Sequence, residues 1–153
     1  MSIAEAYHLP SVKPLPDLSR TPWRWLTLSD CHGIVCLVDA DDYPWIAERS
    51  WNYGWHVRTP WKFYAKRNTG KARSTIYLAR EIMMRAEPGA DFSLHVDHVN
   101  GQSLDDRKAN LRWVTPIENM ANRRPRDKIP TLEQIAAQLL RTFNRTIDAS
   151  VPF

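Results

Sequence analysis

The sequence is poor in cysteine and contains no long apolar run. Its two cysteines, Cys31 and Cys36, are too few for the disulfide framework of a small secreted protein, and their spacing does not fit a CxxC zinc site. No run of about 18 apolar residues is present to span a membrane, and the N-terminus lacks the apolar stretch of a signal peptide. We therefore expect a soluble cytoplasmic protein with two reduced thiols in or near a core strand.

Acidic residues are missing from one long window, residues 51–80. The window instead interleaves aromatic and basic residues, and the whole chain has a net charge of +4. One interpretation is a sheet whose basic face contacts nucleic-acid phosphates, because a surface of one sign binds several phosphates at once. The alternative is a solvated basic face over an aromatic core. The basic residues of the window are Arg58, Lys62, Lys66, Arg67, Lys71, Arg73 and Arg80.

Proline density and hydrophobic patterning divide the 153 residues into four parts. Residues 1–22 are a proline-rich extended arm, and residues 23–90 are a basic, aromatic-rich β-sheet region. Residues 91–124 form a strand–turn–strand–helix unit, and residues 125–153 are a basic linker with an amphipathic helix. This order predicts an α+β fold: a small antiparallel sheet, then the compact unit, then a C-terminal helix.

Apolar patterns locate the elements of the two flanking parts. We predict a strand from Trp23, a central strand over residues 34–38, a short helix capped at Asp42, and a helix over residues 78–86. Thr131 and Gln134 form a capping box for the C-terminal helix. This helix is expected to dock its apolar stripe on the core, with a dimer seam or a DNA-contacting module as alternatives. The stripe consists of Leu132, Ile135, Ala136, Leu139, Leu140 and Phe143.

The unit at residues 91–124 has local signals for two strands and a helix. Residues 94–99 and 111–114 are apolar enough for two antiparallel strands, joined through a turn at Asn100-Gly101. The sequence Thr115-Pro116-Ile117-Glu118 then starts a helix in three ways: a cap, a proline at the first position and a glutamate at the third. These signals predict a ββα unit with Asn119 in the helix, facing the hairpin.

Four polar residues of this unit form a candidate hydrolytic site. His98 is the candidate general base, since a histidine with a pKa of about 6.5 accepts a proton at neutral pH. Asp97 and Asn119 offer one carboxylate and one amide oxygen, which are hard ligands that favour Mg²⁺ or Mn²⁺ over zinc. Asn110 is expected to accept a hydrogen bond from the His98 ring and so fix its tautomer. Neighbours on a strand face opposite sides, so Asp97 and His98 share a site only if the strand twists or ends there.

The unit resembles the HNH nuclease family, in the branch whose last histidine is replaced by asparagine. Residue types, order and spacing all match: Asn110 follows Asp97 by 13 positions (110 − 97), and Asn119 follows it by 22 (119 − 97). The resemblance implies a ββα-metal (His-Me finger) nuclease motif over residues 91–124, with the same roles for the four polar residues. The matching residues are Asp97-His98, Asn100-Gly101, Leu104-Asp105-Asp106-Arg107, Asn110-Leu111 and Glu118-Asn119.

The front half resembles the strand-rich segment that precedes the HNH motif in many phage proteins. It departs from that pattern at Ala79, where those proteins usually carry a histidine. The matching residues are Leu37-Val38-Asp39, Asp42-Tyr43, Tyr64-Ala65-Lys66-Arg67 and Leu78-Ala79-Arg80-Glu81-Ile82-Met83.

The resemblance implies a metal-dependent, phage homing-type DNA endonuclease that hydrolyses double-stranded DNA with Mg²⁺ or Mn²⁺ in the host cytoplasm. One such site cuts one strand, so a monomer is expected to nick, and the choice between monomer and homodimer stays open. Arg107 has an alternative role, pairing with carboxylates to brace its loop. Contacts to backbone phosphates are expected from Arg58, Lys62, Lys66, Arg67, Lys71, Arg73, Arg107, Lys108, Arg112, Arg123 and Arg124.

Three other functions remain open from the sequence. The chain is alternatively a DNA-binding or regulatory module with a vestigial nuclease site, or a nuclease for phage packaging or defence. A third possibility is an RNA-directed enzyme that stacks bases on the aromatic residues of positions 51–64. His95 either contacts DNA or packs within the protein.

Overall fold

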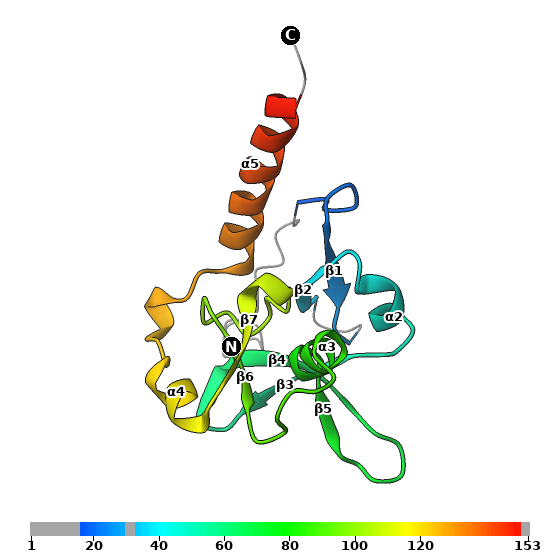
Figure 1. Ribbon diagram of the computed structural model, residues 1–153, viewed down its shortest axis with the longest axis vertical. Helices are drawn as coiled ribbons and strands as arrows, with labels where there is room; N and C mark the ends of the chain where they lie inside the picture. The colour runs from blue at the N-terminus through cyan, green and yellow to red at the C-terminus, as the bar shows by residue number, and fades with distance from the viewer. Residues whose placement is uncertain (1–15, 30–32, 151–153) are drawn as a thin grey trace.

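The computed structural model describes the backbone of residues 16–29 and 33–150, and the side chains of these up to residue 146. Over these residues the chain is an α+β protein with three small antiparallel sheets and four α-helices (Figure 1). None of the described helices is both long and apolar enough to cross a membrane. Most of the N-terminal arm and Cys31 lie outside the described residues.

The first sheet pairs β1 (Trp23–Thr27) with β2 (Val35–Asp39). The predicted strand at residues 34–38 exists, but its central place in a sheet was wrong: within the described chain β2 pairs along its length only with β1. Its other edge instead binds a loop, because Leu37 donates from N to Leu104 O at 2.8 Å and accepts from Asp106 N at 2.8 Å. Cys36, Leu37 and Val38 are fully buried in the core, and Cys36 is a free thiol.

The short helix α2 (Tyr43–Ala47) follows β2. Asp42 occupies the N-cap position as predicted, but its side chain makes no capping hydrogen bond. Its carboxylate instead accepts a hydrogen bond from Trp45 Nε1 at 3.2 Å and contacts Lys108 Nζ at 2.8 Å. Ile46 is the fully buried residue of this helix.

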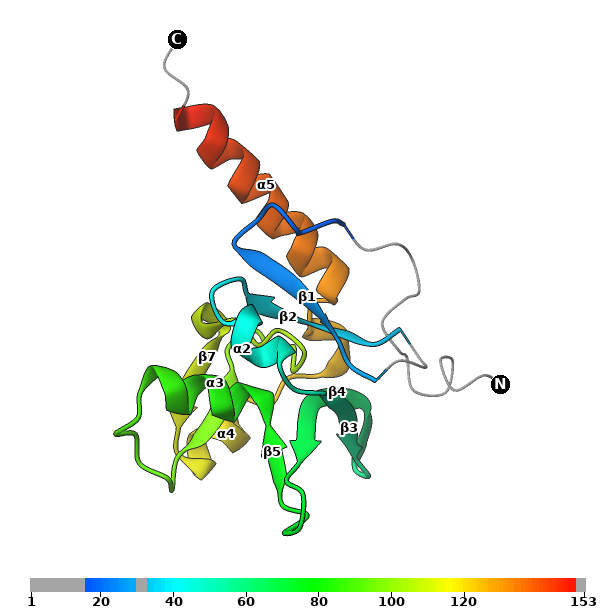
Figure 2. The same ribbon diagram turned by 90° about the vertical axis from the view of Figure 1, so that its right-hand side faces the viewer.

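The second sheet has the order β3 (Asn52–His56), β4 (Thr59–Asn68) and β5 (Thr75–Tyr77), and its hairpins extend to one end of the molecule (Figure 2). Burial alternates along β4, since Phe63 and Ala65 are buried in the core whereas Lys62 and Tyr64 are only partly buried. The Tyr64 ring packs edge-on against Tyr77 of β5, with centroids 6.0 Å apart. The basic residues of β4 are therefore divided between two faces.

Helix α3 (Leu78–Ala86) has the predicted bounds and buries Leu78, Ala79 and Ile82. Its Arg80 connects the helix to the segment before the next strand, because the guanidinium donates to Leu94 O at 2.8 Å and Phe92 O at 3.0 Å. Arg80 therefore has a structural role, because it fixes the segment before the ββα unit to helix α3.

The ββα unit consists of β6 (His95–His98), β7 (Leu111–Val114) and α4 (Pro116–Ala121). β6 and β7 pair antiparallel, and the loop between them ends in a 3₁₀ turn, η1 (Lys108–Asn110). The predicted Asn-Gly turn is present: Gly101 has a φ of 81° and donates from N to His98 O at 2.9 Å. Left-handed backbone of this kind favours glycine, because a Cβ there approaches the neighbouring carbonyl.

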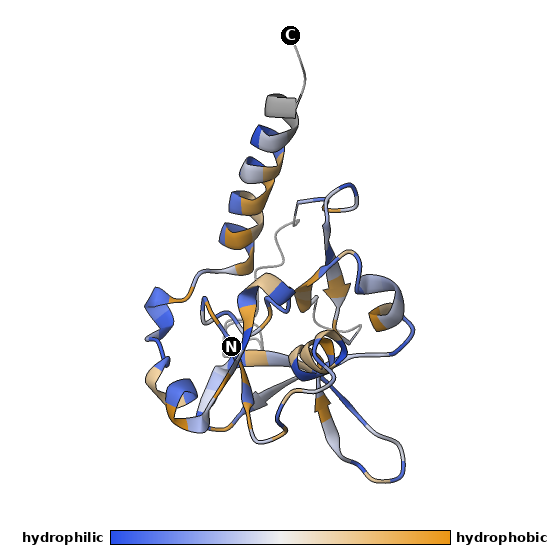
Figure 3. Ribbon diagram, viewed as in Figure 1, coloured by the Kyte–Doolittle hydropathy of each residue, from blue (hydrophilic) through white to orange (hydrophobic). Residues whose placement is uncertain are grey.

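A 3₁₀ turn, η2 (Arg126–Lys128), leads to the C-terminal helix α5 (Leu132–Ser150). Its predicted capping box is present, with Gln134 N donating to Thr131 Oγ1 at 3.2 Å and Thr131 N donating to Gln134 Oε1 at 2.9 Å. Apolar residues lie along one side of the helix (Figure 3), and Phe143 packs edge-on against Trp23 with centroids 6.1 Å apart. The stripe thus docks on the protein's own core over its described part.

One hydrophobic core joins all of these parts. Leu26 of β1, Leu37 of β2, Phe63 of β4, Leu111 of β7 and Ile135 of α5 belong to the same buried cluster. Apolar residues therefore pack the ββα unit into the core, and the candidate site consists of polar residues of the same unit.

Candidate active site in the ββα unit

The position of the candidate site is set by the register of the hairpin and by the cap of α4. Asp97 lies opposite Arg112, and His95 lies opposite Val114. Thr115 begins α4 with the full predicted capping box: its Oγ1 accepts from Glu118 N at 3.3 Å, and Glu118 Oε2 accepts from Thr115 N at 2.7 Å. The cap fixes the first turn of α4 against the end of β7.

Asp97 is 8% exposed and is held from two sides. Its Oδ2 accepts hydrogen bonds from Arg112 Nε at 2.9 Å and from Asn122 Nδ2 at 2.7 Å. Arg112 Nη2 also lies 2.9 Å from the same oxygen. Asp97 is therefore fixed between β7 and the end of α4.

Asn119 faces the hairpin, as predicted, but its contact is with the beginning of β6. Its Nδ2 lies 3.3 Å from His95 Nδ1. His95 and Asp97 are two positions apart on one strand, so they share a face of β6. Asp97 and Asn119 therefore belong to the same side of the hairpin, the side that α4 covers.

His98 has a different environment from its neighbour Asp97. Its Nε2 lies 2.8 Å from Asp106 Oδ1, and the side chains of His98 and Asp106 are 8% and 2% exposed. Burial raises the pKa of the Asp106 carboxyl above its ordinary value, and the hydrogen bond with His98 opposes that rise. His98 is the last residue of β6. The contact of His98 with Asp106 is thus separate from the contacts of Asp97 with Arg112 and Asn122.

The predicted hydrogen bond between Asn110 and His98 is wrong. Asn110 Oδ1 accepts from Asn100 N at 3.0 Å, and Asn110 Nδ2 donates to Asp105 O at 2.8 Å. Both ends of the amide are thus used to close the loop between β6 and β7. The sequence could not reveal this, because the partner of Asn110 depends on the path of the whole loop.

The outer face of the second sheet lies beside the ββα unit. Burial lowers the pKa of Lys62, while the nearby charge of Asp97 opposes that shift and Arg123 adds to it. Arg123 also acts electrostatically on Tyr64 of the same face. Lys62 lies over the Tyr64 ring at 5.6 Å, and it has no ion-pair partner among the described residues. Lys62 of the second sheet is therefore close enough to Asp97 and Arg123 of the ββα unit to interact with both electrostatically.

Several predicted phosphate-binding residues are engaged within the protein. Arg67 pairs with Glu81 at 3.1 Å, and Arg107 pairs with Asp105 through two hydrogen bonds of 2.7 Å. Both arginines are largely buried in these pairs, and Arg107 has the alternative, loop-bracing role. Lys108, Arg112 and Arg124 also have partners within the protein but are more exposed. The predicted residues that are exposed and make no ion pair in the described structure are Arg58, Lys71, Arg73 and Arg123.

The resemblance implies a divalent metal ion, and the side-chain oxygens of Asp97 and Asn119 are its candidate ligands. Among the described residues, every hydrogen bond of Asp97 uses Oδ2, and that of Asn119 uses Nδ2, which leaves Oδ1 of each as a hard ligand. No group of three His, Cys, Asp or Glu in the described chain is placed to hold a metal. Mg²⁺ usually keeps several waters and takes one or two protein oxygens, so the types of these two ligands suit a magnesium ion.

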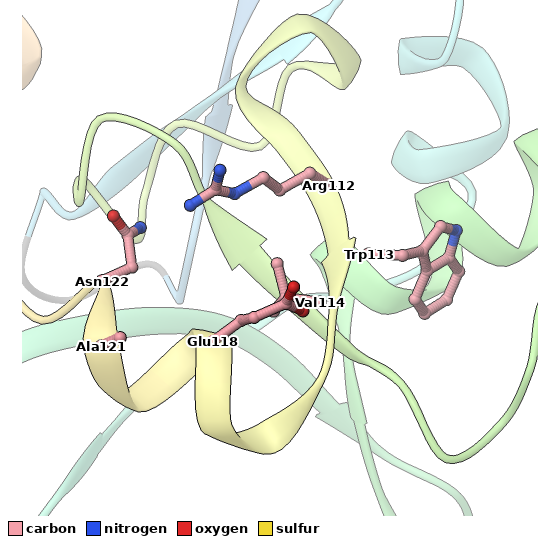
Figure 4. A pocket seen from close by; sticks show the side chains of 6 residues that line it. All are labelled: Arg112, Trp113, Val114, Glu118, Ala121 and Asn122. Atoms are coloured by element: carbon pink, nitrogen blue, oxygen red, sulfur yellow. The ribbon is translucent and has the colours of Figure 1, made fainter.

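An open pocket of about 420 Å³ lies between β7 and α4 (Figure 4). Arg112 and Asn122, the two residues that hold Asp97, lie close together along one side of it, whereas Trp113 projects from the other side of β7. Sequence analysis missed the roles of Asn122 and Asp106. Asn122 follows Asn119 by three positions, a spacing that places both on one helix face, so this signal was available. Asp106 belonged to a block that matched the family pattern, but no local signal indicated its contact with His98.

Comparisons with known proteins add no assignment: no family model, no curated protein and no solved structure matches this chain.

Proposed function

We propose that the chain is a metal-dependent DNA endonuclease of the HNH type that hydrolyses phosphodiester bonds. The observation that supports this best is the arrangement of the ββα unit. Asp97 of β6 and Asn119 of α4 supply a carboxylate and an amide on the side of the hairpin that α4 covers, and His98 supplies an imidazole at the end of the same strand, beside a buried carboxylate. These are the ligand and base types that hydrolysis of a phosphodiester needs.

Asp97 Oδ1 and Asn119 Oδ1 are the atoms that would hold Mg²⁺ or Mn²⁺. A bound divalent ion neutralises charge on the scissile phosphate and stabilises the leaving oxygen. The role of this chain is to fix the two oxygens. Asn122 and Arg112 orient the Asp97 carboxylate through its other oxygen, and His95 orients the Asn119 amide.

His98 accepts a proton from the attacking water in this proposal. Its Nε2 is occupied by Asp106 at 2.8 Å, so Nδ1 is the nitrogen that takes the proton. Substrate binding belongs to the adjacent basic face, where Lys62 has no ion-pair partner in the described chain and Arg123 is exposed. Double-stranded DNA is the proposed substrate, and a single site of this kind nicks one strand. The homing role is the biological setting that the resemblance implies.

Plasmid cleavage tests the proposal. The protein is expected to nick supercoiled plasmid in Mg²⁺ and to stop when EDTA is added. His98→Ala should lower the rate at least about hundredfold while DNA binding persists, because general-base catalysis contributes about 10²–10⁴-fold. His56→Ala is the matched control, since His56 is exposed on the β3–β4 hairpin and should leave the rate unchanged.

A second candidate function is a DNA-binding module with a vestigial nuclease site. The observation that favours it is the guanidinium of Arg112, which occupies one oxygen of Asp97 at 2.9 Å. If wild type and His98→Ala bind DNA equally and neither cuts it in Mg²⁺ or Mn²⁺, this second function replaces the first.

A further inference from the structure

We propose that Asp106 is the positioning residue for His98, holding the imidazole in the tautomer with hydrogen on Nε2 so that Nδ1 stays free to accept a proton. The inference deepens the proposed nuclease function and rests on it for its catalytic consequence. Its structural part, the tautomer of a buried histidine, is measurable without any activity.

The contact between the two residues is short and largely shielded from water. His98 Nε2 and Asp106 Oδ1 are 2.8 Å apart, and the two side chains are 8% and 2% exposed. A carboxylate accepts hydrogen bonds, so an ionised Asp106 requires the hydrogen on Nε2. The remaining ring nitrogen is then an acceptor, which is the state that a general base needs.

Asp106 itself is fixed by β2. Its backbone N donates to Leu37 O at 2.8 Å, while Leu37 N donates to Leu104 O at 2.8 Å. The loop therefore binds the edge of β2 on both sides of one residue. This anchoring fixes the loop that carries the Asp106 carboxylate to a strand outside the ββα unit.

The neighbouring carboxylate, Asp105, provides an instructive contrast. Asp105 is fully buried but well compensated, with Arg107 at 2.7 Å on each oxygen and Asn100 Nδ2 at 2.9 Å. Asp106 is 1% exposed, and its Oδ2 has no hydrogen-bond partner in the described structure. Burying a carboxylate with a single partner is unfavourable for stability. Among the described residues, His98 is the one hydrogen-bond partner of the Asp106 carboxylate, which indicates that this carboxylate orients His98 whereas that of Asp105 stabilises the loop.

No other described side chain orients the ring. Asn110, the residue expected to do so, uses Oδ1 for Asn100 N and Nδ2 for Asp105 O. Asp97 is engaged by Arg112 and Asn122 on the α4 side. Asp106 is thus the residue whose removal releases the imidazole.

The experiment combines imidazole NMR with kinetics on three variants. Asp106→Asn keeps the shape and removes the charge, and Asp106→Ala removes the partner. Asp39→Asn is the matched control, because the partly buried Asp39 carboxylate also holds this loop, accepting from Lys108 N at 2.8 Å, but does not touch His98. Thermal unfolding verifies that each variant is folded at the assay temperature.

In the metal-free wild type, ¹⁵N-detected imidazole spectra should show the Nε2–H tautomer of His98, and Asp106→Ala should lose that preference. In Mg²⁺, Asp106→Asn and Asp106→Ala should lower kcat by about 10–100-fold with KM for DNA nearly unchanged, as for other residues that orient a reacting group. Asp39→Asn should retain the wild-type kcat and KM. A general loosening of the loop would instead lower the activity of Asp39→Asn as well.

Two results would overturn the inference. One is an Nδ1–H tautomer in wild type. The other is an active wild type whose kcat and tautomer are unaffected by both Asp106 variants. The proposed function fails in a different way, through a wild type that does not cut DNA while its His98 tautomer still depends on Asp106.

Discussion

Asn119 and Asn122 lie one helical turn apart on α4, yet they contact different residues of β6. Asn119 approaches His95 at 3.3 Å, whereas Asn122 binds Asp97 Oδ2 at 2.7 Å. The first arrangement leaves an amide oxygen for a cation, and the second fixes the carboxylate that would share that cation. At the scale of single residues, two asparagines thus have different expected roles, one as a metal ligand and one as an orienting partner, and mutation can separate them.

Metal binding is expected to respond more strongly to Asn119→Ala than to Asn122→Ala. Loss of a ligand should weaken Mn²⁺ binding by more than the loss of an orienting partner, which typically costs about 10–100-fold. Calorimetric titration of Mn²⁺ into both variants measures this difference. The larger loss in Asn122→Ala would show that Asn122 supplies the amide ligand.

The residue types of the site could be predicted from the sequence, but their partners could not. Asp97 and Asn119 face the same side of the hairpin, as the strand and helix periods require. The partner of His98 was predicted wrongly because Asp106 reaches it through a loop anchored on β2, about 70 residues earlier in the chain. No spacing rule within the ββα unit contains that information.

At the scale of elements, local signals were reliable. The bounds of α3 and β7 and the capping boxes of α4 and α5 agree with their patterns, since each depends on neighbours within a few residues. The sequence wrongly predicted β2 as a central strand, whereas one of its edges binds a loop. A continuous apolar run indicates that a strand is buried, but it does not indicate how many strands pair with it.

The cap of α4 is expected to depend on pH, whereas the cap of α5 is not. Hydrogen bonds from the Thr115 backbone and side chain lower the pKa of Glu118 below its ordinary value of 4.5. A lowered folded pKa means that the stabilisation is present above pH 4.5 and is lost as the pH falls through the folded value. Gln134, the matching residue of α5, does not titrate.

Amide chemical shifts of Thr115 and Thr131 measure this difference. Between about pH 6 and about pH 3, the Thr115 signal should move with a midpoint below that of an ordinary glutamate, and the Thr131 signal should not move with it. Glu118→Gln should abolish the movement at Thr115. An unchanged Thr115 titration in that variant would contradict the assignment.

The turn between β6 and the loop should not tolerate a side chain at Gly101. Gly101→Ala adds a Cβ at a φ of 81° and 3.3 Å from Ile129 Cγ1. We expect a loss of about 1–2 kcal/mol in the free energy of unfolding, measured by urea denaturation. Gly89→Ala is the control, because its Cβ would meet no atom within 4 Å. Equal stability of the two variants would contradict the strain argument.

At the scale of the whole molecule, the two faces of the second sheet have different surroundings: one lies near the ββα unit, and the other enters the core. Lys62 and Arg67 of β4 illustrate the division: Lys62 acts electrostatically on the candidate site, and Arg67 pairs with Glu81 and stacks over Trp51 at 5.3 Å. Two cations of one strand are therefore expected to behave differently.

Lys62→Ala should weaken DNA binding and reduce the slope of log K against log salt by about 0.9, the value for one phosphate contact. Arg67→Ala should leave that slope unchanged and instead lower the free energy of unfolding by roughly 1–3 kcal/mol, since Glu81 loses its partner. Filter binding over a salt series and urea denaturation measure the two effects. A salt slope that changes equally in both variants would show that Arg67 also contacts DNA.

The anchoring of the β6–β7 loop on both sides of Leu37 has a consequence for how this protein can be re-engineered. The hairpin and α4 are continuous in sequence, but the loop that carries Asp106, the partner of His98, is hydrogen-bonded to β2 in the front half. A graft of residues 91–124 onto another scaffold would transfer the ligand oxygens, His98 and Asp106, but not the backbone of Leu37 that anchors the loop carrying Asp106. A new scaffold would therefore need a strand edge in the place of β2.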